Sequence, residues 1–530
     1  MALKNLLLGS QMMAAEPVPA ARLGRVHFAG IGGAGMSGIA RIMLARGIGV
    51  SGSDARDSAL LGELRELGAS VHVGHAPGHL GHLGPGDTLV VSSAIRADNP
   101  ELAEATRRGM RVVHRAAALA SVMAGRRVIA VAGTHGKTTT TSMLTTVLRE
   151  CGADPGYVIG GILTETGLGA EDGSGLDFVA EADESDGSFL LLSPDLAIIT
   201  NIEADHLDNY GSLADIQAAF TTFGLRVSGM VLTCADDPGA EAVAARLDPA
   251  RVRRYGESPH ADYRLTDVAS RGMAISFTVA ADQGPFGEIF TQMTVDVPGH
   301  HNALNATAAF AAAIELGFAP PRVAAAIAGY RGARRRMELK GEARGVRVLD
   351  SYAHHPTELA ADLRAARDIT QHAGKGRVIA IFQPHLFSRT RIFAAEFGAA
   401  LGLADEAIVL DVYAAREDPE PGVTGQLIVD AVPGGHARFM PDPARVAALI
   451  DAIAEPGDLV LTMGAGDITA LGPRLVGRLG GSRECPNPAA SSWTAPSSMK
   501  PLATARLLVL RRDTGAAAGA WRSSPSRPSA

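Results

Sequence analysis

The residues best suited to chemistry form a glycine-rich loop, Gly-Thr-His-Gly-Lys-Thr-Thr-Thr at 133–140. An apolar run (128–132) precedes it, and residues at helical spacing follow it. In that setting, backbone N–H groups and a helix N-terminus cradle phosphate. We expect Lys137 to reach the terminal phosphates and Thr138 to bind Mg²⁺. Val131 stands where the usual G-x-x-x-x-G-K-[ST] pattern has glycine, so the loop is a variant. The sequence predicts a site for ATP or GTP.

A second glycine loop, residues 30–38, lies between a short strand pattern and a helical segment. It contains G-x-G-x-x-G, and Asp54 follows 19 residues after Gly35. This is the dinucleotide-binding fingerprint, in which a pyrophosphate lies on the helix N-terminus. NAD, FAD and a UDP-sugar all carry a diphosphate, so the loop favours this class of ligand without choosing among them. Ser92 and Ser93 follow a further strand, at the end where such folds bind ligands.

Two acidic clusters end apolar strands in the middle of the chain, at 181–186 and 203–208. In a parallel sheet, those strand ends lie on the same edge as the phosphate loop. Carboxylates and an imidazole beside phosphates suit metal ligation, because a cation offsets phosphate charge. A single such acid is more simply a helix cap or a solvated loop residue. Two clusters in one phosphate-binding domain favour a metal site.

The last third of the chain repeats the plan of apolar strands alternating with helical segments, which indicates a Rossmann-like domain. Histidines and arginines follow its strands, at 352–358 and 383–390. They could bind an anion such as a substrate carboxylate or ATP phosphates. The pair His354 and His355 could also bind metal, but no third ligand has suitable spacing, so we set that interpretation aside.

Composition and length narrow the class of protein. A chain of 530 residues, 46% hydrophobic, suggests about three domains with large cores. No stretch approaches the ~18 apolar residues of a membrane span, and the first residues are too short an apolar patch for a signal peptide. A net charge of -7 gives no reason to expect nucleic-acid binding. Three widely spaced cysteines fit neither disulfides nor zinc, so we expect a reducing cytoplasm.

We therefore expect an α/β fold of three domains: an N-terminal Rossmann-like domain (22–125), a central P-loop mononucleotide-binding domain (126–335) and a C-terminal Rossmann-like domain (336–480). Residues 481–530 carry a charge of +5, which leaves -12 for the rest, and are rich in Ser, Pro and Ala. We expect this tail to be disordered and to take no part in the chemistry.

Taken together, these motifs resemble the Mur ligase family, over roughly residues 22–480. Gly-Ile-Gly-Gly-Ala-Gly-Met-Ser-Gly at 30–38 and Tyr-Ala-His-His-Pro-Thr-Glu at 352–358 carry the most specific likeness. Within the family, the likeness is to the branch that adds L-alanine to UDP-N-acetylmuramate. It implies ATP-driven amide formation in cell-wall precursor synthesis, through an acyl phosphate and a tetrahedral intermediate.

The resemblance also implies roles for individual residues. Lys137 with Glu181 and His206 would serve phosphoryl transfer, and Thr138, Glu181 and His206 would hold Mg²⁺. ATP would contact Asn302 and Asp350 besides the loop residues Gly133, Thr134, His135, Gly136, Lys137, Thr138 and Thr139. The UDP-sugar would lie on Gly32, Gly33, Ala34, Gly35, Asp54, Ser92 and Ser93. The substrate carboxylates would meet Arg335, Arg336, Tyr352, His354, His355 and Arg389.

Several alternatives stay open. The base that deprotonates the amine could be His206, His354 or His355. Sister ligases carry a carbamylated lysine downstream of the histidine matching His206, yet this chain has no lysine between Lys137 and Lys340. A ligase adding a recycled murein peptide shares the same motifs. An NAD-dependent oxidoreductase would explain only the first glycine loop, and a non-catalytic nucleotide sensor would not need the lysine and metal ligands. The protein could be a monomer or a homodimer.

Overall fold

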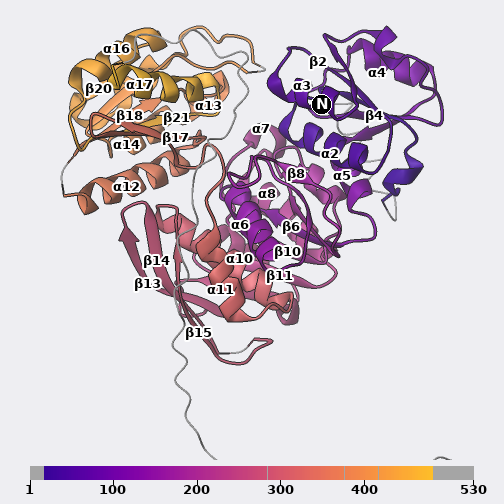
Figure 1. The fold of residues 1–530 in the computed structure, drawn as a ribbon, viewed down its shortest axis with the longest axis horizontal. Coiled ribbons are helices and arrows are strands. Elements are labelled where there is room, and N and C mark those ends of the chain that lie inside the picture. Colours follow the sequence, from indigo (N-terminus) through magenta and orange to yellow (C-terminus); the bar gives the residue numbers. More distant parts are fainter. Residues whose placement is uncertain (1–16, 283, 375, 416, 482–530) are drawn as a thin grey trace, which may run out of the picture. The chain divides into compact units, whose positions relative to one another are not determined.

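The computed structural model describes residues 17–282, 284–374, 376–415 and 417–481, which fold around three β-sheets (Figure 1). The predicted tail lies outside the described residues from residue 482 onward. Each sheet falls within one of the three predicted α/β segments, while the segment boundaries themselves stay predictions. Among the described residues, no helix is long and apolar enough to cross a membrane.

The first sheet has five parallel strands in the order β3-β2-β1-β4-β5, as a Rossmann-like domain requires. Its strands are β1 (Val26–Ala29), β2 (Val50–Asp54), β3 (Ser70–Val73), β4 (Thr88–Val91) and β5 (Arg111–His114). Its helices are α2 (Ala34–Ala45), α3 (Ala59–Glu66), α4 (Pro100–Arg107) and α5 (Arg115–Met123). The glycine loop connects β1 to α2, so the predicted strand–loop–helix order is confirmed at this position.

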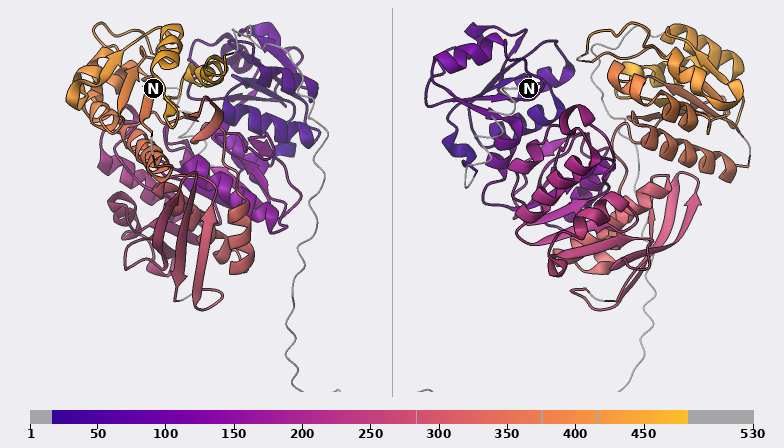
Figure 2. Two further views of the ribbon diagram at one scale, coloured as in Figure 1. Left: turned by 60° about the vertical axis from the view of Figure 1, so that its left-hand side comes forward. Right: turned by 180° about the vertical axis from the view of Figure 1, so that it is seen from behind.

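The central sheet has ten strands in the order β15-β14-β13-β12-β11-β10-β6-β9-β7-β8. They are β6 (Arg127–Ala132), β7 (Gly156–Val158), β8 (Ala170–Glu171), β9 (Asp177–Glu181), β10 (Leu196–Ile199), β11 (Met230–Cys234), β12 (Val252–Gly256), β13 (Tyr263–Arg271), β14 (Ala274–Ala281) and β15 (Ile289–Val295). Strand β6 pairs in parallel with β9 and β10, and these three carry the phosphate loop and both acidic clusters at their carboxyl ends. Strands β13 to β15 add an antiparallel ribbon that the sequence patterns did not predict (Figure 2).

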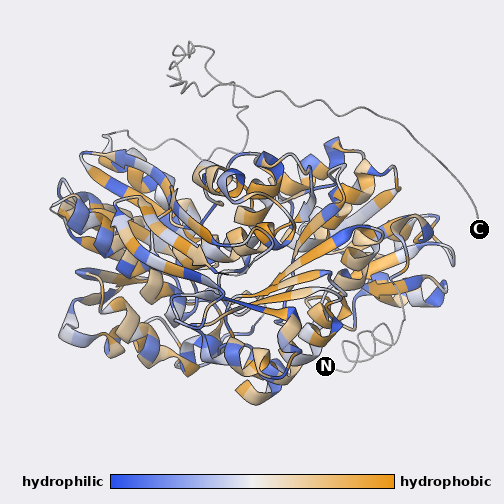
Figure 3. Ribbon diagram, turned by 90° about the horizontal axis from the view of Figure 1, so that it is seen from below, coloured by the Kyte–Doolittle hydropathy of each residue, from blue (hydrophilic) through white to orange (hydrophobic). Residues whose placement is uncertain are grey.

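Alternating side chains of β6 belong to two different cores. Ile129 and Val131 pack with α6 (Lys137–Glu150), α10 (His300–Glu315) and α11 (Pro320–Gly329) on one face of the sheet. Ala130 packs on the other face with α8 (Leu213–Arg226) and α9 (Pro238–Ala244). Each fully buried Val or Ile contributes about 1.5–3 kcal/mol. The strands are therefore hydrophobic along their length, while hydrophilic residues gather on the outer sides of helices (Figure 3).

The third sheet has six strands in the order β16-β17-β21-β18-β19-β20, with only β16 antiparallel. They are β16 (Glu338–Ala343), β17 (Val346–Ser351), β18 (Val378–Phe382), β19 (Glu406–Val409), β20 (Ala437–Phe439) and β21 (Leu459–Met463). The helices are α12 (Pro356–His372), α13 (Phe387–Ile392), α14 (Ala394–Leu401), α15 (Gln426–Ala431), α16 (Pro443–Ile453) and α17 (Leu471–Leu479). The parallel strands place the predicted histidine and arginine segments at one edge.

Glycine is required at position 133, where the chain leaves β6. Gly133 has φ of +137°, and a Cβ atom there would lie 2.0 Å from the Thr200 hydroxyl oxygen. We predict that Gly133→Ala lowers the free energy of unfolding by about 1–3 kcal/mol. The phosphate loop would have to move away from Thr200, at the end of β10, to make room for the added methyl group. The substitution should also abolish binding of an ATP analogue, measured by calorimetry beside thermal unfolding.

The matched control is Gly62→Ala inside α3, where an added Cβ meets nothing within 4 Å. That change should stabilise the chain by about 0.5–1 kcal/mol. A Gly133→Ala variant that melts like the unmodified chain and still binds the analogue would show that the loop tolerates a side chain.

Candidate active site

A cavity of about 350 Å³ brings residues of all three predicted segments together. The phosphate loop lines it with Thr134 to Thr138, and the acidic clusters line it with Glu181, Asp183, Asp205 and His206. The first glycine loop supplies Ala34 and Gly35, and the C-terminal segment supplies the ring of Tyr352. The predicted site residues that line it are Ala34, Gly35, Thr134, His135, Gly136, Lys137, Thr138, Glu181, His206, Arg336, Tyr352 and His354.

The phosphate loop is held in shape by the end of β10. The backbone N–H of His135 donates to the side-chain oxygen of Asn201 at 2.8 Å, and the Asn201 amide donates back to the His135 carbonyl at 3.0 Å. The Thr200 hydroxyl also donates to that carbonyl at 2.6 Å. These bonds fix the loop before any ligand arrives, so less ordering is needed on binding.

Lys137 is a largely buried cation, with its side chain 15% exposed, and it has a buried counter-charge. Its ammonium group lies 2.9 Å from Glu184 and donates to the carbonyls of Gly133 and Thr134. Burial alone would lower the pKa of Lys137, but Glu184 and Asp183 raise it, so the lysine stays charged. Burial raises the pKa of Glu184 to about 7, against the opposing effect of Lys137. A phosphate would give this ammonium a stronger anionic partner than Glu184.

The predicted metal ligands lie around the same cavity. The Thr138 hydroxyl donates to Glu181 at 3.0 Å, and Glu181 also accepts from the backbone N–H of Gly160 at 2.6 Å. His206 has a left-handed backbone (φ 54°), and its Nε2 lies 3.5 Å from Asp205. Burial lowers the pKa of His206, which keeps the imidazole neutral and able to ligate. This set of a hydroxyl, a carboxylate and an imidazole suits a divalent cation beside phosphates.

The first glycine loop is organised by Asp54. The backbone N–H of Gly32 donates to the Asp54 carboxylate at 2.9 Å, which ties the loop to the end of β2. Ser92 and Ser93 follow β4 but are not among the residues that line the cavity. Arg115, at the start of α5, reaches Asp183 in an ion pair and so connects this domain to the central one.

The C-terminal segment contributes an aromatic and cationic group. The Tyr352 ring lies under the guanidinium groups of Arg335 and Arg336, at 4.8 and 5.5 Å. Arg336 donates to the Thr138 hydroxyl at 3.1 Å, which links it to the phosphate loop. Arg335 instead donates to the carbonyls of Gly464 and Gly466. The two arginines therefore have different surroundings although they are adjacent in sequence.

The histidines and Arg389 differ in their access to this cavity. His354 lines it, and burial lowers the pKa of this histidine to about 3. His355 is not among the lining residues, and burial lowers its pKa to about 4. Arg389 is buried and pairs with Asp205 at 3.2 Å, next to His206.

A second cavity of about 270 Å³ shares His135 and Gly136 with the first. Asn302 and Asn305 line it together, joined by a 3.2 Å hydrogen bond between their amides. Thr139 of the phosphate loop also lines it. Because the two cavities share residues of the phosphate loop, an elongated ligand could have its phosphates on the loop and its other end in the second cavity.

The structure does not bring Asp350 to either cavity. Its carboxylate is fully buried and accepts hydrogen bonds from Thr462 at 2.7 Å and Thr469 at 2.6 Å. Lys340 lies 3.6 Å from the same carboxylate. Asp350 thus has a full set of internal partners, and its expected contact with ATP stays a prediction.

Four residues with central contacts were not predicted as site residues: Arg115, Glu184, Asn201 and Glu358. Three of them stand inside or beside motifs that the sequence analysis singled out, but no pattern assigned them a partner. No sequence pattern indicated Arg115, because this residue contacts Asp183 only where the first and central domains pack together.

Comparison with known proteins gives one consistent result. Three family models match: "Mur ligase family, catalytic domain" (25–127), "Mur ligase middle domain" (131–313) and "Mur ligase, glutamate ligase domain" (335–466). A UDP-N-acetylmuramate--L-alanine ligase of Thermobifida fusca is 58% identical over 474 residues, covering 88% of this chain and 98% of that relative. One of Kineococcus radiotolerans is 57% identical, covering 87% and 97%.

Solved structures agree with this result. The UDP-N-acetylmuramate-alanine ligase of Thermotoga maritima superposes with a TM-score of 0.73 at 30% identity, covering 87% of this chain and all of that one. A murein peptide ligase of Psychrobacter arcticus gives a TM-score of 0.64 at 27% identity, with the same coverage. The three-domain α/β fold is therefore shared with these proteins.

The contacts around Thr138 lead to a test of the metal ligands. We predict that Glu181→Gln and His206→Ala each raise the Mg²⁺ concentration for half-maximal phosphate release from ATP, by about 10-fold or more. Each removes a group that would hold an ion neutralising phosphate charge. His300→Ala, an exposed histidine outside both cavities, serves as the control. Magnesium titrations of both variants that overlay the unmodified curve would show that neither residue is a ligand.

Proposed function

This chain belongs to the Mur ligase family, and we propose that it joins L-alanine to the carboxylate of UDP-N-acetylmuramate while ATP is converted to ADP and phosphate. The product is UDP-N-acetylmuramoyl-L-alanine, a precursor of peptidoglycan. One observation carries the proposal: a single cavity is lined by a phosphate loop, a dinucleotide-type glycine loop and the Tyr352 segment. A ligase that binds ATP, a UDP-sugar and an amino acid needs the binding segments for all three around one cavity.

The chemistry requires an activated carboxylate. A carboxylate is a poor acylating agent, so its oxygen attacks the γ-phosphate of ATP, and ADP leaves. Phosphoryl transfer depends mainly on positioning and charge neutralisation. The charged Lys137 and the N-terminus of α6 supply both at the loop. A Mg²⁺ ion held by Thr138, Glu181 and His206 would stabilise charge on the phosphate oxygens.

The amine then displaces phosphate from the acyl phosphate through a tetrahedral intermediate. It must lose a proton to do so, which calls for a neutral base within reach. His206 and His354 both line the cavity, and burial lowers the pKa of each, so both are neutral at pH 7. Neither is assigned as the base, because His206 would hold Mg²⁺ in this proposal and a pKa of about 3 makes His354 a weak proton acceptor. His355 is not among the lining residues.

The UDP-sugar and ATP have separate places in this proposal. The Gly32–Gly35 loop would hold the UDP diphosphate at the N-terminus of α2, and Asp54, Ser92 and Ser93 would contact other parts of UDP. The base and ribose of ATP would occupy the second cavity, beside Asn302 and Asn305. Arg336 and Tyr352, which line the first cavity, would contact the sugar carboxylate and the amino acid. Because ATP and UDP-sugars are made in the cytoplasm, we place the enzyme there, as a monomer or a homodimer.

The alternatives are less well supported. A ligase for a recycled murein peptide has the same fold, but the related chain of that activity is 27% identical, against 50–58% for eight curated alanine ligases. An NAD-dependent oxidoreductase leaves the phosphate loop and Lys137 without a role.

Amino-acid selectivity tests the proposal. We predict that phosphate release with ATP and UDP-N-acetylmuramate is fastest with L-alanine, slower with glycine and L-serine, and negligible with bulky or acidic amino acids. A pocket for one methyl group discriminates against slightly smaller or more polar side chains by only ~1–3 kcal/mol. Steric exclusion of large side chains is stricter. Initial rates across a panel of amino acids give the result.

Lys137→Ala, which should release no phosphate with any amino acid, controls for contaminating ATPases. A preference for glutamate, lysine or the tripeptide of recycled murein over L-alanine would move the protein to another branch of the family.

A further inference from the structure

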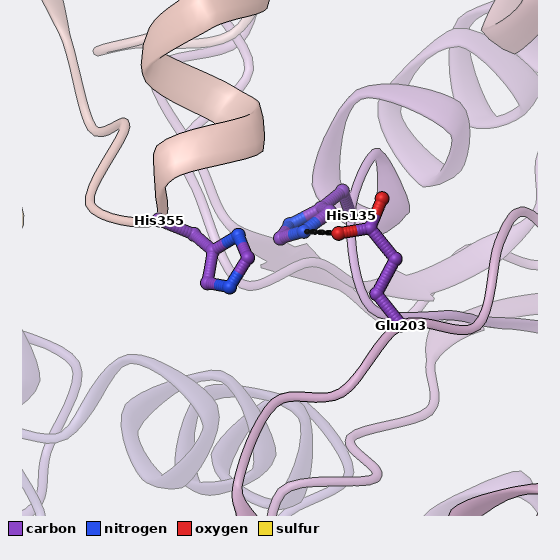
Figure 4. Close-up of side chains that lie close together, drawn as sticks. All are labelled: His135, Glu203 and His355. Atoms are coloured by element: carbon purple, nitrogen blue, oxygen red, sulfur yellow. Dashed lines mark ion pairs between the residues drawn. The ribbon is translucent and has the colours of Figure 1, made fainter. Parts of the chain in front are cut away.

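Three side chains from distant parts of the chain converge beside the phosphate loop (Figure 4). They are His135 of the loop, Glu203 after β10 and His355 at the start of α12. One ligand atom of each lies within 4.8 Å of the others. Within the described ranges, no other group of three His, Cys, Asp or Glu side chains is this close. Spacing along the chain offers no third ligand beside His354 and His355, whereas the fold brings His135 and Glu203 to His355.

His355 has the surroundings of a ligand without its ion. The residue is 5% exposed, and its ring caps the first turn of α12 by a loose contact with the backbone N–H of Glu358. Neither ring nitrogen makes a hydrogen bond of ordinary geometry with the described residues. Its ring faces that of His135, with centroids 4.7 Å apart. Buried polar nitrogens normally have partners, because leaving them unpaired costs free energy. A cation bound at one of these nitrogens, in the plane of the ring, would satisfy His355.

His135 is oriented as a metal-binding histidine usually is. Its Nδ1 lies 3.2 Å from Glu358, while its Nε2 lies 3.5 Å from Glu203. Glu358 is itself fixed by the backbone N–H groups of His354 and His355. A carboxylate on one ring nitrogen sets the ring orientation, and an ion bound at Nε2 would displace the proton through which this nitrogen pairs with Glu203. Glu358 would therefore be the residue that orients His135.

Glu203 provides the anionic ligand and makes the cluster accessible to an ion from solvent. Its side chain is 35% exposed, so an ion can reach the cluster from solvent. The Thr357 hydroxyl donates to it at 2.8 Å and holds it near α12. Ligands of a tetrahedral zinc ion at ~2.0–2.2 Å lie about 3.3–3.5 Å apart. The separation of His135 and Glu203 already matches, and the His355 nitrogen, which lies within 4.8 Å of both, would move closer on binding.

We propose that His135, Glu203 and His355 form a binding site for a divalent transition-metal cation of the zinc class, which links the central domain to the C-terminal domain. Two imidazoles and one carboxylate favour Zn²⁺ or Co²⁺ over Mg²⁺, which prefers oxygen ligands. The site is separate from the Thr138–Glu181–His206 set, which contains one imidazole. It goes beyond the proposed function, since ligation of L-alanine does not call for it. A bound ion would raise the melting temperature of the chain by mass action.

Cobalt titration of the full chain without nucleotide tests the site, because Co²⁺ absorbs visible light and its spectrum reports its ligands. We expect Glu203→Gln and His355→Gln each to weaken Co²⁺ binding by at least about 10-fold. Glu203→Gln keeps the shape of a partly exposed side chain, so the variant should fold. His300→Gln removes an exposed histidine that pairs with Glu257 outside the cluster, and it should leave Co²⁺ affinity unchanged.

X-ray absorption of the unmodified chain loaded with one equivalent of Zn²⁺ gives a readout that needs no variant. The proposal expects two imidazoles on the ion, whereas the set around Thr138 could supply only one. A single imidazole would overturn it. So would equal Co²⁺ affinity in the unmodified chain, Glu203→Gln and His355→Gln, or no Co²⁺ binding up to about 1 mM, the weakest affinity that a specific site would show.

Discussion

The buried ammonium of Lys137 is the charge on which the site depends. A cation removed from water must be neutralised, and Glu184 does this at 2.9 Å with Asp183 nearby. Asp183 in turn pairs with Arg115 of the first domain. The acidic cluster after β9 is therefore a counter-charge shared by two domains. Phosphates of ATP would take over part of its role, so nucleotide binding and domain contact are linked through the same buried charges.

The sequence predicted the parts of the site that local patterns encode. Glycines 133 and 136 both have positive φ, and the loop connects a strand to a helix as the motif requires. Parallel strands deliver residues after β6, β9 and β10 to one edge, which brought Glu181 and His206 to the cavity. The three-domain fold could be predicted from the alternation of strands and helices, because the spacing of apolar residues along the sequence indicates each type of element.

Contacts between distant segments could not be predicted in this way. His135 meets Glu358, and Arg389 meets Asp205, only because two domains pack together. Asp350 has the strand-end position of a ligand-binding residue, yet its carboxylate accepts hydrogen bonds from Thr462 and Thr469. The ribbon from β13 to β15 also escaped prediction, although the alternation of buried and exposed residues along β15 is typical of a half-exposed antiparallel strand. Such features depend on packing, which a single sequence does not record.

The central claim is that two nucleotides bind to different domains and meet in one cavity. Calorimetry of Lys137→Ala tests it most directly, with UDP-N-acetylmuramate and an ATP analogue titrated separately. Loss of a charged hydrogen bond of ~1.5–3 kcal/mol should weaken the ATP analogue by about 10- to 100-fold. The affinity for UDP-N-acetylmuramate should stay within about 2-fold of the unmodified chain, well under the ~1.4 kcal/mol of a tenfold change. An equal loss for both ligands would contradict the account.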